Sequence, residues 1–101
     1  MPTVKKSIAY RRRGAAATLT LNGSIGMFEA EAFHESASKA LADTPAKTVT
    51  IDLAGAERLD ISALQILHAL RRDLAQNGRA TVISEPTERT LADAIAAGMP
   101  L

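Results

Sequence analysis

The residues best placed to do chemistry lie at Asp60 and Ser62, where a predicted strand and loop give way to a predicted helix. An Asp just before a helix accepts hydrogen bonds from the free amides of the first turn, so we expect Asp60 to be an N-cap. Ser62 falls in that first turn, where free N–H groups and the helix dipole stabilise an anion. Ser62 is then either a phosphorylation site, gaining about −1.5 to −2 charges beside Asp60, or merely a small polar residue.

Candidates for catalysis are otherwise few. His34 and His68 are the only histidines, and both fall on the polar sides of predicted helices, where we expect them to be solvated. Gln65, His68 and Arg72 share one helix face by their spacing. No motif brings Ser62 and His68 together as a nucleophile and its base. The sequence therefore predicts a protein that is not an enzyme.

The sequence has no recognisable motif for a cofactor or a metal ion. Gly23 and Gly26 lack the Lys-Ser/Thr of a P-loop and the later glycine of a dinucleotide fingerprint, so we expect them to form a turn. Asp52, Glu57 and Asp60 do not follow the pattern of a calcium-binding loop. The lack of cysteine excludes disulfides and thiolate sites and suits a reducing cytosol. We expect a binding role without a cofactor.

Composition favours one domain and disfavours nucleic acid as a partner. With 101 residues, the chain has room for one core, so residues 1–101 are expected to form a single domain. Aromatic residues make up only 3% of the chain, which leaves no stacking platform for bases, and a net charge of +1 provides no long-range field. No apolar stretch of about 18 residues and no secretion signal is found, so we expect a cytoplasmic protein without direct membrane insertion.

Basic residues cluster near the N-terminus, at Lys5, Lys6 and Arg11 to Arg13. We interpret them as a solvated hairpin tip and as protection of an edge strand, since Lys and Arg commonly guard such edges. Contact with a phosphate or a lipid headgroup is the alternative interpretation.

Four segments have the composition of β-strands. The first two are separated by Arg11 to Gly14 and predict a hairpin. The third is rich in β-branched residues and predicts a central strand that carries Ile51 and Leu53. The four predicted strands are Thr3 to Ala9, Ala15 to Leu21, Lys47 to Leu53 and Arg79 to Ser84.

Three amphipathic segments predict helices that pack on these strands. The first places Phe28 and Phe33 at apolar positions, and the third begins near Pro86 and is shorter. The order β-β-α-β-α-β-α contains two β-α-β crossovers, so we predict an α/β fold with a mixed, mostly parallel sheet of about four strands. The helices are Met27 to Leu41, a second from Asp60 to the cap at Asn77-Gly78 with Leu67, Leu70 and Leu74 inward, and a third around Leu91, Ala94 and Ile95.

Around the second predicted helix the sequence resembles a STAS domain. This is the family of anti-sigma-factor antagonists, which also forms cytoplasmic parts of sulfate transporters and of a lipid-transport system. The strand Val49 to Leu53, the helix Ser62 to Leu67 and the strand after Asn77-Gly78 fall in the family's order. Gly23-Ser24-Ile25 resembles the family's turn before the first helix. The resemblance covers nearly the whole chain and implies a non-enzymatic module that binds a protein.

The resemblance also shows where this chain departs from the antagonists. Their motif resembles Asp-Ser-Ser/Thr-Gly-Leu, and a kinase that is itself the anti-sigma factor phosphorylates the first Ser. This chain has Asp60-Ile61-Ser62-Ala63-Leu64, so Ile61 takes that slot and Ser62 keeps the second hydroxyl. The form Asp-x-x-Ala-Leu-Gln-x-Leu looks more like small STAS proteins of lipid transport or bacterial signalling. The chain ends at Met99-Pro100-Leu101, where the family usually adds a strand and a helix, which leaves an edge for a partner or a second copy.

Two functions follow from the resemblance. The first is partner switching in bacterial signalling, in which the module binds a kinase-like anti-sigma regulator and Ser62 is the candidate phosphorylation site. The alternative is a cytoplasmic STAS subunit of a phospholipid ABC transport system, whose second helix contacts the ATPase subunit without phosphorylation. The candidate partner-binding residues are Asp60, Ile61, Ser62, Gln65 and His68.

Overall fold

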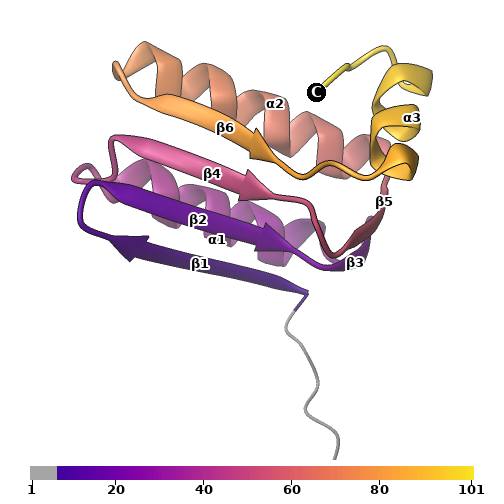
Figure 1. The fold of residues 1–101 in the computed structure, drawn as a ribbon, viewed down its shortest axis with the longest axis horizontal. Coiled ribbons are helices and arrows are strands. Elements are labelled where there is room, and N and C mark those ends of the chain that lie inside the picture. The colour runs from indigo at the N-terminus through magenta and orange to yellow at the C-terminus, as the bar shows by residue number, and fades with distance from the viewer. Residues whose placement is uncertain (1–6) are drawn as a thin grey trace, which may run out of the picture.

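The computed structural model describes residues 7–101, so Lys5, Lys6 and the start of the first predicted strand lie outside the described residues. The chain forms an α/β fold around a four-stranded sheet of order β1-β2-β4-β6 (Figure 1). Strands β1 and β2 are antiparallel, whereas β2, β4 and β6 run parallel, which confirms the predicted mixed sheet. The strands are β1 (Ile8–Arg13), β2 (Ala16–Leu21), β4 (Thr48–Asp52) and β6 (Ala80–Ser84).

Strand β1 continues through the arginines that were expected between the first two strands. Its pairing with β2 extends to Arg13 opposite Ala16, and Gly14, with a φ of +61°, supplies the tight turn. All three arginines, Arg11–Arg13, are exposed on this edge of the sheet. These residues therefore lie within an edge strand rather than at the tip of the hairpin, the position at which Lys and Arg commonly guard a sheet.

Helices α1 (Ala30–Ala42) and α2 (Ile61–Gln76) lie side by side on one face of the sheet, and α3 (Glu88–Ala96) stands at one end of it (Figure 1). Every second residue of β2 and β4 points into this layer and is buried. The predicted packing is confirmed, because Ile51 of β4 is buried together with Leu67, Leu70 and Leu74 of α2. The opposite face of the sheet carries the half-buried threonines Thr18, Thr20, Thr48 and Thr50.

The first helix starts later than predicted. Helical structure begins at Ala30, and Met27 and Phe28 form a turn in which their side chains are 77% and 97% exposed. Phe33, five residues after Phe28, is fully buried. Five residues correspond to a rotation of about 140° around a helix, so one helix face does not bury both rings.

A second, two-stranded sheet was not predicted. Strand β3 (Gly23–Ile25) pairs in parallel with β5 (Ala56–Leu59), where the sequence indicated a turn and a loop. Gly23 has a φ of +75°, and its N–H donates to the carbonyl oxygen of Gly55 at 2.8 Å. These strands are too short for an alternating pattern to be seen in the sequence. They connect the segment before α1 to the segment before α2.

Helix α3 begins at Glu88, with the side chain of Thr87 as its N-cap. Asp93 holds it against β5, because this carboxylate accepts two hydrogen bonds of 3.0 Å from the Arg58 guanidinium and one of 3.0 Å from the N–H of Leu59. The predicted apolar residue Ile95 is 69% exposed, so it does not contribute to the core.

Candidate partner-binding site

Asp60 is the N-cap of α2, as predicted. Its Oδ1 accepts a hydrogen bond of 3.0 Å from the N–H of Ala63, and its backbone is extended at φ −84° and ψ −179°. The backbone N–H of Asp60 donates to the carbonyl oxygen of Ile25 at 3.1 Å. Gly26, the residue after Ile25, lies close to the side chain of Asp60. A Cβ atom added to Gly26 would lie 3.2 Å from Asp60 Oδ2. The end of β3 therefore lies directly against the start of α2.

Three exposed apolar side chains follow Gly26 and Asp60, the two residues in contact, within two residues along the chain. Met27 and Phe28 follow Gly26, and Ile61, which is 56% exposed, follows Asp60. We call Met27, Phe28 and Ile61 the apolar patch. Isolated exposed apolar residues are common on protein surfaces, but a group of them commonly marks an interaction site. Met27 and Phe28 were expected within the first helix and not at a binding surface, although the five-residue spacing from Phe28 to Phe33 does not fit one helix face.

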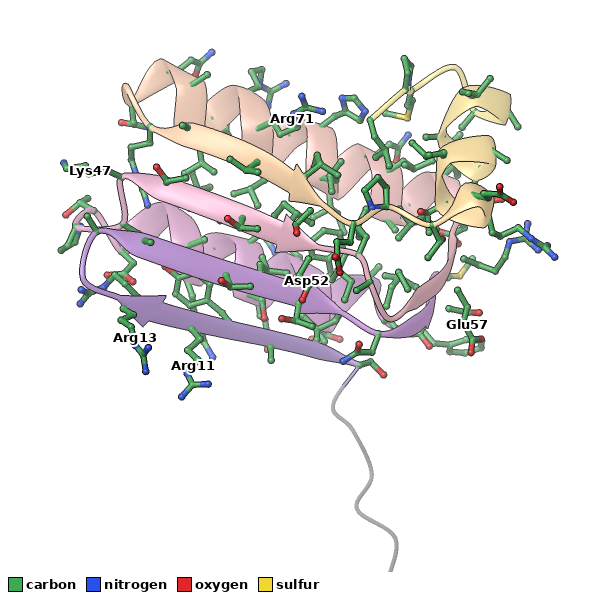
Figure 2. The ribbon with its side chains drawn as sticks, in the orientation of Figure 1. Arg11, Arg13, Lys47, Asp52, Glu57 and Arg71 are labelled. Carbon is green, nitrogen blue, oxygen red and sulfur yellow. The ribbon has the colours of Figure 1, made fainter. Side chains whose placement is uncertain are left out.

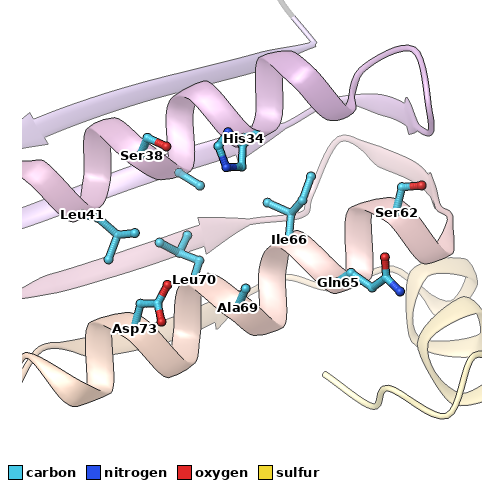
Figure 3. A pocket seen from close by; sticks show the side chains of 10 residues that line it. His34, Ser38, Leu41, Ser62, Gln65, Ile66, Ala69, Leu70 and Asp73 are labelled. Carbon is cyan, nitrogen blue, oxygen red and sulfur yellow. The ribbon is translucent and has the colours of Figure 1, made fainter.

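A groove of about 350 Å³ separates α1 from α2 (Figure 3). Leu41 of α1 and Ile66 and Leu70 of α2 form part of its apolar lining, while Ser62 and Gln65 lie at one end and Asp73 at the other. The groove thus begins beside the apolar patch. Its further lining residues are His34, Ala37, Ser38 and Ala69.

The structure brings together four of the five predicted partner-binding residues. Asp60 and Ile61 lie at the start of α2, and Ser62 and Gln65 line the adjoining groove. His68 does not line the groove. It is half-buried, and its Nε2 lies 3.1 Å from the carbonyl oxygen of Met99.

The expectation that His68 is solvated is therefore wrong, because the C-terminal segment folds back onto α2. His34, in contrast, is exposed as expected. His34 and Ser62 line the same groove, but no hydrogen bond between them is found within residues 7–101, and Asp73 lies at its far end (Figure 3). A nucleophile, a base and an acid are not assembled there.

Charged residues of both signs occur at each end of the molecule. Arg13 and Lys47 lie near one end of the sheet, where Arg12 forms an ion pair with Asp43 (Figure 2). Glu57 of β5 lies near the other end, where it lines a shallow hollow together with Arg58 and Arg89. Asp60 is a second exposed acidic residue at this end. A group of three or more His, Cys, Asp or Glu side chains able to hold a metal ion is not found among the described residues. Within the same part of the chain, no helix is long and apolar enough to cross a membrane.

The family model described as Mlab, STAS domain matches residues 8–100. The chain belongs to the STAS domain family. Among curated proteins, no significant match to it was found. The family assignment confirms the resemblance inferred from the strand-loop-helix segment that ends in α2.

Solved structures share the fold of this STAS domain. One chain of Mglu is 27% identical with a TM-score of 0.71, covering 84% of this chain and 21% of that chain. This STAS domain thus spans about a fifth of the Mglu chain. An anti-sigma factor antagonist from Mycobacterium paratuberculosis is 24% identical with a TM-score of 0.71, covering 90% of this chain and 76% of that chain. The Bacillus cell fate determinant SpoIIAA in its phosphorylated form is 14% identical with a TM-score of 0.73, covering 91% and 84%.

Proposed function

We propose that this STAS domain is a non-enzymatic protein-binding module in bacterial partner switching. Its partner docks on the start of α2 and on the turn before α1. The observation that carries this proposal is the apolar patch, since Met27, Phe28 and Ile61 are all exposed on segments joined by the contact between Gly26 and Asp60. Burying such side chains supplies the main favourable free energy of protein association.

The residues around the patch supply polar contacts. Asp60 keeps an exposed carboxylate at the rim, and Ser62 and Gln65 present hydroxyl and amide groups at the end of the groove. We assign His68 an indirect role, in which it holds the C-terminal segment through Met99. Polar groups at a rim of this kind orient a partner more than they contribute affinity.

A kinase-like anti-sigma regulator is the partner class that we favour, because similar solved structures are anti-sigma factor antagonists. Ser62 is the candidate phosphorylation site. A phosphate there would place about −1.5 to −2 charges beside the Asp60 carboxylate and at the mouth of an apolar groove. Phosphorylation of Ser62 would therefore oppose docking on this surface.

A second candidate function is favoured by Ile61. This residue takes the slot of the phosphorylated Ser in the antagonists, and its aliphatic side chain is 56% exposed. A surface with an apolar residue in that slot binds constitutively, as a STAS subunit of a phospholipid ABC transport system would bind its ATPase subunit. Capture of an ATPase rather than a kinase would select this function.

The test has two stages. Partners are first captured from the native organism and identified by mass spectrometry, and their affinity is then measured for the wild type and for Phe28→Ala and Ile61→Ala. We expect each variant to weaken binding by more than about 10-fold, as loss of a central apolar anchor does. The matched control is Ile95→Ala, which removes an exposed apolar side chain from α3. Unchanged affinity in both patch variants would refute the proposed surface.

A further inference from the structure

The two edges of the main sheet differ in their protection against added strands. Strand β6 is an outer strand, and among residues 7–101 it pairs only with β4. Its residues Ala80–Ser84 carry no charge and include no proline, whereas the opposite edge strand, β1, carries Arg11–Arg13. Charged residues and prolines are the usual means of preventing one edge from pairing with another. Strand β6 lacks both.

The outward main-chain groups of β6 belong to Thr81 and Ile83. The N–H of Ala80 donates to the carbonyl oxygen of Lys47, and the carbonyl oxygen of Ser84 accepts from the N–H of Leu53, both at 2.9 Å and both on the β4 side. Main-chain groups alternate between the two sides of a strand. The N–H and C=O groups of Thr81 and Ile83 therefore point away from β4, toward the open edge.

We propose that β6 is a strand-addition edge at which a second copy of this chain pairs antiparallel, so that one sheet runs through both copies. Thr81 and Ile83 flank Val82 symmetrically, so a two-fold axis at Val82 places Thr81 of each copy opposite Ile83 of the other. Each of these pairs exchanges both main-chain hydrogen bonds. A second copy fits because the strand is its own complement and presents no like charges across the axis.

A further observation supports this edge. Val82 pairs in register with Thr50 and is 46% exposed on the uncovered face of the sheet, and in the dimer its side chain packs on its counterpart across the axis, with Cβ atoms about 4.5–5.5 Å apart. The dimer does not use the apolar patch, so it is independent of the proposed partner-binding function.

Sedimentation equilibrium of the full chain over a dilution series tests the proposal. We expect the wild type to form a dimer. Val82→Lys is expected to be a monomer with an unchanged circular dichroism spectrum, because the substitution places two like charges directly opposite each other at the axis. The matched control is Thr50→Lys, which adds the same charge on the same sheet face but on the inner strand β4, and which is expected to dimerise. Thr81→Pro, which removes an outward N–H group and no main-chain hydrogen bond to β4, is a second variant expected to be a monomer.

Amide hydrogen exchange followed by NMR identifies the edge directly. In the dimer the N–H groups of Thr81 and Ile83 exchange slowly, and in Val82→Lys they exchange fast, while the residue 82 amide stays protected by β4 in both proteins. A wild type that remains a monomer up to millimolar concentration would overturn the proposal. A wild-type dimer in which the Thr81 and Ile83 amides exchange fast would also overturn it, since the copies would then associate through another surface.

Discussion

The guanidinium of Arg79, the residue just before β6, donates a hydrogen bond of 2.6 Å to the carbonyl oxygen of Ala40, near the end of α1. Arg79 is only 6% exposed, and it satisfies three further carbonyl oxygens there. Free carbonyls at a helix C-terminus carry partial negative charge, which a buried cation compensates. One side chain thus joins the helix layer to the edge of the sheet. The three further acceptors are Leu41, Asp43 and Ala46.

The first prediction is that Arg79→Met lowers the free energy of unfolding by about 3 kcal/mol, because it leaves buried carbonyl oxygens without donors. Urea denaturation measures the change. The control is Arg72→Met, whose guanidinium is exposed and is expected to change stability by less than about 0.5 kcal/mol. Equal effects of the two substitutions would show that the buried bonds contribute little.

The second prediction concerns Leu67 of α2, whose side chain is 1% exposed and lies in the core between the helices and the sheet. Leu67→Ala removes buried methyl groups and leaves a cavity, so it should lower the free energy of unfolding by about 2–5 kcal/mol. Ile95→Ala, at an exposed position of α3, serves as the control. A change below about 0.5 kcal/mol for Leu67→Ala would contradict the observed core.

The third prediction is a pH dependence that arises from Asp93. Its hydrogen bond from Arg58 holds the pKa of the Asp93 carboxyl below its ordinary value of 3.8. A lowered pKa in the folded state adds stability above the unfolded pKa, and this stability is lost as the pH falls through the folded pKa. The stability difference between wild type and Asp93→Asn should be constant near neutral pH and shrink below pH 3.8. Denaturant melts of both proteins at several pH values measure it, and a difference that grows in acid would refute it.

The fourth prediction uses the only tyrosine of the chain. Burial, together with the hydrogen bond of 2.7 Å from its hydroxyl to Asp43, raises the pKa of Tyr10 to about 12. Because the folded pKa exceeds the unfolded value of 10.0, stability from this group is lost as the pH rises from 10.0 toward 12. An ultraviolet titration measures the pKa, and Asp43→Asn should lower it. A titration midpoint near 10.0 in the folded protein would show that the phenol is freely solvated.

The fifth prediction concerns phosphorylation. Ser62 lies one residue beyond the antagonists' slot, so its side chain is rotated by about 100° around α2, and it is half-buried at the groove. An anti-sigma kinase aimed at the first slot meets the exposed Ile61 instead. We expect weak or no labelling of the wild type and better labelling of Ile61→Ser, measured by phosphosite mapping after incubation with the kinase and ATP. Efficient labelling of the wild type that persists in Ser62→Ala would place the site elsewhere.

Elements with a long, regular pattern were predictable from the sequence. The leucines of α2 recur at helical spacing, and Asp60 precedes them as a typical N-cap, so both the helix and its start were predicted correctly. The β-branched run of β4 likewise indicated a buried central strand. The fold and the position of the candidate site therefore follow from local patterns.

Features created by tertiary contacts were not predictable in the same way. Strands β3 and β5 contain three and four residues, and only their pairing with each other defines them as strands. The half-buried state of His68 depends on Met99, which is 31 residues away in the chain. The exposure of Phe28 depends on where α1 begins, and helix boundaries are the least certain part of a pattern-based prediction.

The small β3–β5 sheet has a thermodynamic consequence for binding. Main-chain hydrogen bonds fix Ile25 and Asp60 to each other, so the segments that carry the apolar patch are held in place before a partner arrives. Little backbone conformational entropy is then lost on association, and more of the interaction free energy remains as affinity. The complex would form nearly as a rigid-body encounter, and differences in affinity between partners would appear mainly in their dissociation rates.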